Sequence, residues 1–180
     1  MKKFLQFAGL ISCCLALVAF ILLMVTHSVV YLDDAAKNWY SGISAVFGGG
    51  QAQISVSGFG LTVSTGAVDV DAKLAWCALL AWIFGLVAML VLLFGALIPV
   101  LKIKALEKFA GLLNLIAVGL LVVAGIFVFF TVPAFAGANE WKNSDGWGLG
   151  AGYVIAAILF LAAGAVAALS PVMELLGKKK

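Results

Sequence analysis

Few side chains in this sequence have the chemistry of a catalytic or metal-binding site, and their spacing narrows what they could do. Asp33, Asp34, Asp69 and Asp71 offer the hard oxygen ligands that Ca²⁺ prefers, but they lack the flanking pattern of a calcium-binding loop. His27 is the only histidine, so an imidazole-based metal site would lack a partner. We therefore predict no metal site and interpret the aspartates as solvated loop charges.

The polar residues also provide no recognisable catalytic constellation. The chain contains no nucleophile–base pair, phosphate-binding glycine loop or zinc-ligand spacing. An enzyme that acts on membrane lipids would have to rely on His27, Glu140 and Asp145, and this class is kept as an alternative. Our prediction is that the protein is not an enzyme and has neither a catalytic residue nor a cofactor.

The elements that would position these residues are apolar helices long enough to cross a lipid bilayer. Of the 180 residues, 65% are hydrophobic and 11% are charged, with a mean hydropathy of +1.21, whereas soluble domains carry about 25% charged residues. The predicted fold is an all-α transmembrane four-helix bundle with a small extracytoplasmic cap, made of a helix plus a β-hairpin. The single integral membrane domain, 1–180, has predicted crossings at 4–26, 74–101, 109–132 and 149–169, outside loops at 27–72 and 133–148, an inside turn at 102–108 and a cytoplasmic tail at 170–180.

The distribution of charge sets the predicted orientation. The turn with Lys102, Lys104, Glu107 and Lys108 lies between the second and third crossings, and the positive-inside rule places it in the cytoplasm. Eight lysines then oppose two glutamates inside, and three lysines oppose six acidic residues outside. Both termini are predicted to be cytoplasmic, in a plasma or cell membrane. All eleven basic residues are lysine, which argues against nucleic acid as a partner because such sites favour arginine.

The three cysteines are predicted to be free, small and buried. Cys13 and Cys14 fall near the middle of the first crossing, and Cys77 falls near the outer end of the second. Their depth difference of roughly 10 Å exceeds the ~7 Å Cα separation that a disulfide tolerates. Residues 10–13 resemble the lipobox of bacterial lipoprotein signals, which would make Cys13 a lipidated N-terminus. The apolar run continues for twelve residues beyond Cys13, which favours an uncleaved first helix.

The first outside loop carries the most patterned sequence of the non-apolar segments. A short helix along the membrane surface is predicted after Asp33 and Asp34, which can cap it. Gly48 to Gly50 end this helix. Its apolar positions recur at helical spacing and are Leu32, Ala36, Trp39, Ile43 and Val46.

A β-hairpin is predicted next in the same loop. Apolar and polar residues alternate over 54–57, and the phase of the alternation flips after Gly58. A two-residue type II′ turn at Gly58 and Phe59 explains the flip. The predicted pairs are Ser57 with Gly60, Val56 with Leu61, Ser55 with Thr62, and Ile54 with Val63. Because a lone hairpin is only marginally stable, residues 28–32 and 67–70 are candidates for further short strands.

The interiors of the predicted crossings contain small and apolar residues rather than charges. No Asp, Glu, Lys or His falls in the middle of a crossing, which argues against a proton-coupled transporter. Asn114 is the main polar exception, and we interpret it as a polar contact between helices. Small residues at regular spacing would let the fourth crossing pack closely, within the bundle or with a second copy. The predicted packing positions in this crossing are Gly148, Gly152, Ala156 and Gly164.

The layout resembles that of claudin-type tetraspan proteins. The resemblance rests on four crossings, both ends inside, a long strand-bearing first outside loop and a shorter second one. Those proteins carry a Trp-containing signature with two cysteines in the first outside loop, where this chain has Trp39 and Tyr40 but no cysteine. The resemblance covers the whole chain in layout and implies an architecture rather than a function.

The outside loops are the only elaborated part of the chain beyond the predicted bilayer. We therefore predict a non-enzymatic structural or interaction protein, or an accessory subunit, that acts through these loops on another membrane protein or on a second copy. Candidate partner contacts are Trp39, Tyr40, Phe59, Trp141 and Trp147. The alternative is an oligomeric passive channel or exporter subunit, with a path lined by Ser12, Asn114 and Thr131.

Overall fold

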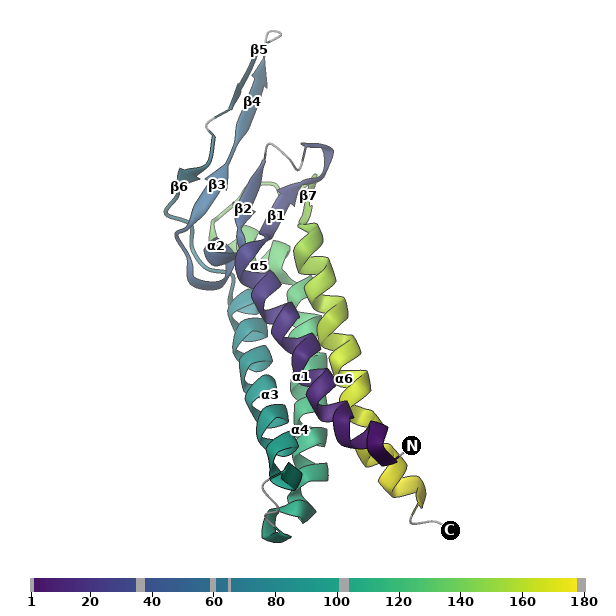
Figure 1. Cartoon of the computed structure of the whole chain (residues 1–180). Coiled ribbons are helices and arrows are strands. Elements are labelled where there is room, and N and C mark those ends of the chain that lie inside the picture. The colour runs from purple at the N-terminus through teal and green to yellow at the C-terminus, as the bar shows by residue number, and fades with distance from the viewer. Residues whose placement is uncertain (1, 35–37, 59–60, 65, 101–103, 178–180) are drawn as a thin grey trace.

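Four long helices run side by side and carry a small β-sheet at one end (Figure 1). The computed structural model describes residues 2–34, 38–58, 61–64, 66–100 and 104–177. The end of the bundle that carries the sheet is called the sheet end below, and α1 begins and α6 ends at the opposite end (Figure 1). The long helices are α1 (Lys2–Val25), α3 (Trp76–Val100), α4 (Lys104–Phe129) and α6 (Ala151–Gly177).

Each long helix contains a stretch that is long and apolar enough to cross a membrane. The four stretches are 19 to 23 residues long, with mean hydropathies of 2.3 to 2.8. At 1.5 Å per residue they span about 28–35 Å, which matches a hydrocarbon core of ~30 Å. None of them contains Asp, Glu, Lys, Arg or His. They are Phe7–Val25, Trp76–Ile98, Gly111–Phe129 and Ala151–Met173. The prediction of four apolar helices in a bundle is confirmed.

The helices form a ring, because α1 and α4 each contact both α3 and α6. The Ser12 hydroxyl donates a hydrogen bond to the Ala163 carbonyl at 2.6 Å and joins α1 to α6. Small side chains let helices approach closely enough for van der Waals packing to hold them together in lipid. Fully buried alanines line the interfaces: Ala16, Ala19, Ala81, Ala88, Ala117, Ala124, Ala156 and Ala163. Large apolar side chains such as Leu90, Leu115 and Ile158 remain exposed on the outer surface of the ring.

The cysteines are free, as predicted. Cys77 is buried and Cys13 is half-buried, with its thiol 3.7 Å from the Met89 carbonyl. Cys14, however, is exposed on the surface of α1, so the prediction that all three are buried was wrong for this residue. On a helix of a bundle only one face is covered by neighbours, and adjacent residues point 100° apart.

The sheet at the end of the bundle joins both connecting segments of the chain. Its strand order is β6-β3-β2-β1-β7, and every neighbouring pair is antiparallel. Four of these strands come from the segment between α1 and α3, and β7 comes from the segment between α4 and α6. The five strands are β1 (His27–Tyr31), β2 (Trp39–Ser41), β3 (Gln51–Gln53), β6 (Val68–Asp69) and β7 (Trp147–Leu149). The strands predicted at 28–32 and 67–70 are thus present, whereas β7 was not predicted.

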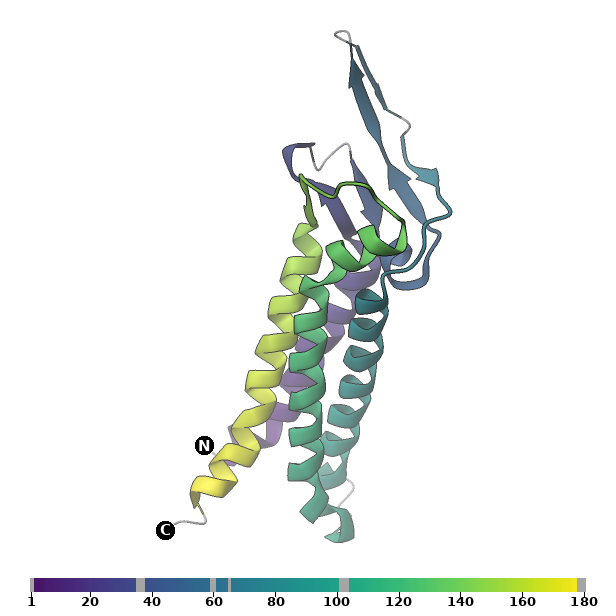
Figure 2. The ribbon, with the colours of Figure 1, turned by 180° about the vertical axis from the view of Figure 1, so that it is seen from behind.

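A second, two-stranded sheet is the hairpin of β4 (Ser55–Gly58) and β5 (Leu61–Ser64), which projects beyond the first sheet (Figures 1 and 2). The hairpin was predicted, but its register was wrong by two residues. The observed pairs are Ser55 with Ser64, Val56 with Val63, Ser57 with Thr62, and Gly58 with Leu61. Both candidate turns contain a glycine that a tight turn can use, so turn chemistry alone does not choose between the two registers.

The predicted surface helix over residues 32–46 is replaced by three shorter elements. Leu32–Asp34 forms a single 3-10 turn, β2 follows, and the helix α2 spans only Gly42–Phe47. The Ser41 side chain caps α2 by accepting a hydrogen bond from the Ser44 N–H at 3.2 Å. The helical spacing of apolar residues was misleading here because Trp39 is held in the sheet by pairing with Val30 and Gln53.

The second connecting segment begins with a helix that the sequence did not suggest. α4 ends at Phe129, and α5 (Thr131–Ala138) follows it with Pro133 in its first turn. Proline is tolerated there because the first N–H groups of a helix have no partner within the helix. The third crossing was predicted to end at 132, before Pro133, and the membrane-length stretch of α4 ends at Phe129. The helix α6 continues through Pro171 to Gly177, although the fourth crossing was predicted to end at 169.

Candidate functional site at the sheet end of the bundle

The base of the sheet is fixed to the bundle around Gly42, the first residue of α2. The Gly42 N–H donates to the Thr26 carbonyl at 2.8 Å, just after α1 ends. The Gly42 carbonyl accepts a hydrogen bond at 3.2 Å from the hydroxyl of Tyr153, a fully buried residue of α6. A Cβ atom at Gly42 would overlap the carbonyl oxygen of Leu23. Only glycine therefore lets α2 approach the end of α1 this closely.

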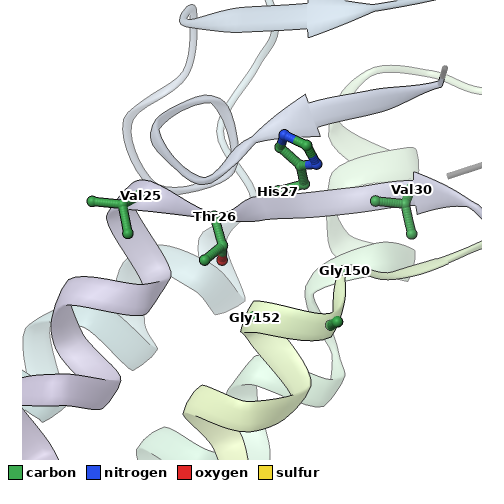
Figure 3. A pocket seen from close by; sticks show the side chains of 7 residues that line it. Val25, Thr26, His27, Val30, Gly150 and Gly152 are labelled. Atoms are coloured by element: carbon green, nitrogen blue, oxygen red, sulfur yellow. The ribbon is translucent and has the colours of Figure 1, made fainter. Parts of the chain in front are cut away.

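A groove opens where α1 passes into β1 and β7 passes into α6 (Figure 3). Its volume is about 500 Å³. A Cβ atom at Gly150 would overlap the His27 carbonyl, and one at Gly152 would overlap the Thr26 side chain, so both glycines are needed for this approach. The Thr26 hydroxyl donates to the Leu22 carbonyl at 2.7 Å. The residues that line the groove are Val25, Thr26, His27, Val30, Gly150, Ala151 and Gly152.

Among the described residues that line the groove, His27 is the only ionisable one. Its imidazole is stacked on the Trp39 indole, with ring centroids 4.1 Å apart and planes 5° apart. Partial burial lowers the pKa of His27, because burial disfavours the charged imidazolium. None of the described residues beside it in the groove carries a carboxylate or a thiol, so these residues offer no acid–base pair and only one metal-ligating side chain.

Five aromatic rings from the sheet, from α5 and from the loop after α5 pack together, and we call them the aromatic cluster: Tyr31, Tyr40, Phe135, Trp141 and Trp147. Tyr40 is central, with its ring 4.9 Å from Phe135, 5.7 Å from Trp141 and 5.8 Å from Trp147. Trp141 and Trp147 are 5.0 Å apart, and Tyr31 is 5.5 Å from Trp147. Each such pair contributes about 0.5–1.5 kcal/mol beyond the burial of its area. Burial raises the pKa of the Tyr40 phenol.

A polar clasp also joins the two connecting segments, on the side of α3. The Asn139 amide accepts a hydrogen bond from the Lys73 N–H at 2.8 Å and donates one to the Lys73 carbonyl at 2.9 Å. The Lys73 ammonium is 2.8 Å from Glu140, and both side chains are exposed. This ion pair raises the pKa of Lys73 and lowers that of Glu140. Glu140 is thus a structural contact here rather than a free acid.

The aspartates of the first connecting segment do not meet. Asp33 follows β1, whereas Asp69 lies in β6, three strands away in the sheet order. With about 4.8 Å between neighbouring strands, the two strands are roughly 14 Å apart, which is too far for one calcium ion. Within the described ranges, no group of three or more His, Cys, Asp or Glu side chains could hold a metal ion.

The predicted partner contacts occupy two places in the structure. Tyr40, Trp141 and Trp147 belong to the aromatic cluster, and each is half-buried. Trp39 points away from Tyr40 along the strand and stacks on His27 instead. Phe59 lies outside the described residues. The sequence did not single out Phe135, Asn139 or Tyr153, although a tyrosine inside an apolar crossing is itself a signal that its hydroxyl has a partner.

The predicted packing residues also have identifiable neighbours. Gly148 lies in β7 rather than in a helix, and a Cβ there would crowd the Leu32 side chain at 2.6 Å. Gly152 faces Thr26, Ala156 is fully buried, and a Cβ at Gly164 would lie 3.6 Å from Leu121 of α4. The Asn114 amide oxygen lies beside two glycine backbones, 3.9 Å from a Cβ built on Gly9 and 3.4 Å from one built on Gly95.

No protein-family model matches the chain, and no curated protein or solved structure matches it.

Proposed function

We propose that the chain is a non-enzymatic, four-pass integral membrane protein that acts as an interaction protein or accessory subunit through its sheet end. In this proposal the sheet end lies outside the cytoplasm and both termini lie inside it. The partner is another membrane protein or a second copy of this chain, and no nucleic acid, metal or cofactor is involved.

The position of the lysines supports this orientation. Lys2, Lys3, Lys104 and Lys108 lie at the start of α1 or α4, at the opposite end of the bundle from the sheet. The segments at the sheet end, 26–75 and 130–150, carry more acidic residues than lysines. Lysine on short loops is retained on the cytoplasmic side during membrane insertion. The sheet end is therefore the end that is translocated across the membrane.

One observation carries the functional proposal: the chain builds a fixed platform at the sheet end of four helices whose membrane-length stretches contain no Asp, Glu, Lys, Arg or His. The sheet pairs β1 with β7 across the two connecting segments, and the aromatic cluster and the Asn139 clasp join the same two segments again. A platform held at so many points keeps the same shape from one encounter to the next, which lowers the entropy cost of binding a partner.

The test is to remove the β4–β5 hairpin while the five-stranded sheet is kept. Deletion of 55–64 and insertion of Asn-Gly leaves β3 and β6 in place to pair with each other. Wild type and variant are purified in mild detergent from the native host, and co-purifying proteins and subunit masses are measured by mass spectrometry. We expect a stoichiometric partner or a homo-oligomer that is lost in the variant. An unchanged set of complexes and an unchanged phenotype would refute the proposal.

The orientation is tested separately by labelling. A single cysteine replaces Ser57 in a background where Cys13, Cys14 and Cys77 are alanine. A membrane-impermeant maleimide added to intact cells is expected to label this variant without permeabilisation. Labelling only after permeabilisation would indicate the opposite orientation, with the sheet end in the cytoplasm.

The channel alternative finds less support within one chain. Ser12 is fully buried between α1 and α6, and Thr131 is fully buried at the start of α5. Asn114 lies against Gly9 and Gly95, about one turn of α1 from Ser12, whereas Thr131 lies at the sheet end. These three polar groups do not line a common path, so conduction would require a pore between subunits.

A further inference from the structure

The β4–β5 hairpin is the one part of the sheet end whose described strands pair only with each other. Both views show it rising beyond the five-stranded sheet, away from the helices and roughly along their direction (Figures 1 and 2). Isolated two-stranded hairpins are marginally stable in water, and an unpaired strand edge is a template for another strand.

A hydrogen bond at the base of the hairpin shows which backbone groups point outward. The Ser55 N–H donates to the Asn38 side chain at 2.6 Å, so it points away from β5. Along each strand of an antiparallel pair, residues alternately point their backbone N–H and C=O groups toward the partner strand and away from it. Two residues that are paired across the strands both point these groups toward each other or both point them outward. Ser57 on β4 therefore also points its N–H and carbonyl outward. On β5 the outward residues are their pairing partners, Thr62 and Ser64.

The two outer edges of the hairpin differ. Asn38 covers the base of β4, whereas β5 pairs with no described strand other than β4. Proteins usually protect such edges with lysine or proline. Here residues 38–68 contain no charged residue and no proline, so nothing in the sequence repels a second identical strand.

From these observations we infer that the outer edge of β5 pairs with β5 of a second copy, as an antiparallel, two-fold symmetric contact. Thr62 pairs with Ser64 of the second copy, Ser64 pairs with Thr62 of the second copy, and the two-fold axis passes between the two Val63 residues. This register forms four backbone hydrogen bonds. The inference rests on the proposed function and names the partner as a second copy.

The geometry also determines where the second copy sits. Copies in one membrane point the same way, so their β5 strands run parallel. An antiparallel β5–β5 contact requires bundles that point in opposite directions, and therefore two membranes that face each other. Four hydrogen bonds make a weak contact, but two membranes that each carry many copies multiply it.

The test uses two populations of vesicles that carry full-length chains with different tags. Val63→Cys, in a background without native cysteines, places two thiols across the two-fold axis, where Cα atoms of a non-hydrogen-bonded pair are about 4.5 Å apart and a disulfide can form. Val56→Cys is the matched control, because Val56 pairs with Val63 at the same height on β4. We expect disulfides between the two tags with Val63→Cys and none with Val56→Cys.

Proline variants test the hydrogen bonds themselves through vesicle clustering, measured by light scattering. Thr62→Pro removes an outward N–H from β5, and Ser57→Pro removes one from β4, so both spare the bonds within the hairpin. We expect Thr62→Pro to weaken clustering about tenfold, since it removes one hydrogen bond at each of two symmetry-related positions, and Ser57→Pro to leave clustering unchanged.

Three results would overturn the inference: no disulfide between the two tags, disulfides only within one population, or equal effects of the two prolines. A foreign partner that is lost when the hairpin is removed, without vesicle clustering by the wild type, would also overturn it. That last result would leave the proposed function standing, so the two failures are distinguishable.

Discussion

Replacement of Gly42 by alanine is the sharpest test of how the sheet is joined to the bundle. At an ordinary helical position this change stabilises a protein by about 0.5–1 kcal/mol, because alanine loses less backbone entropy on folding. At Gly42 the new methyl group would overlap the Leu23 carbonyl and lie 3.0 Å from the Thr26 carbonyl. Both obstacles are backbone atoms at the end of α1, which cannot turn away as a side chain can.

The loss of stability in Gly42→Ala follows from the displacement of α2 away from the end of α1. Overpacking a well-packed site costs about 1–3 kcal/mol. Separation of α2 from α1 would also strain the Gly42 N–H bond to Thr26 and the Tyr153 bond to the Gly42 carbonyl, each worth about 0.5–1.5 kcal/mol. We expect Gly42→Ala to lower the free energy of unfolding by about 2–4 kcal/mol, which exceeds the gain from backbone entropy.

The assay is unfolding of the detergent-solubilised protein, followed by tryptophan fluorescence, since Trp141 and Trp147 report on the aromatic cluster. Gly119→Ala in α4 is the matched control, because no atom lies within 4 Å of a Cβ built there. It should stabilise the protein by about 0.5–1 kcal/mol. The reasoning fails if Gly42→Ala is as stable as Gly119→Ala.

Three further outcomes are expected. Tyr153→Phe removes the hydroxyl that donates to Gly42 and should cost about 0.5–1.5 kcal/mol in the same unfolding assay; a neutral result would mean that the bond contributes nothing. Tyr40→Ala, which removes the central ring of the aromatic cluster, should cost about 2–4 kcal/mol and red-shift the tryptophan emission, and an unshifted spectrum would count against the cluster. Lys73 lowers the pKa of Glu140 from 4.5, so the contribution of this pair is present above pH 4.5 and is lost as the pH falls through the lowered pKa. Stability measured against pH should therefore fall less steeply in Lys73→Met than in the wild type, and identical profiles would show that the pair is inert.

The sequence predicted the helices well because their signal is local. A run of about 20 apolar residues without charges has few alternatives to a membrane-spanning helix, and all four runs form helices. Alternation over residues 54–64 is equally local, and it predicted the hairpin although the register was wrong by two residues.

The sheet was missed because its pairing is not local. β7 consists of three residues, Trp147–Leu149, which have no alternation to detect and pair with a strand more than 100 residues earlier. Gly148 was assigned to a helix for the same reason, since small residues at four-residue spacing also occur by chance near a helix start. The proposed partner contacts were chosen as aromatic residues outside the helices, and the structure shows that such residues also hold the sheet together.

The glycines at the sheet end follow from a mismatch between two packing distances. β1 continues from α1 through Thr26, and β7 continues into α6 through Gly150, so the strand pair and the helix pair share the same two chain segments. Paired strands are about 4.8 Å apart, whereas packed helices are 8–10 Å apart. The helices must therefore converge as they approach the sheet, and no side chain fits between them at the last turn. Gly150 and Gly152 supply that space against His27 and Thr26. Any larger residue at these positions would separate β7 from β1, and the platform on which the proposed function depends would then divide along the boundary between the two connecting segments.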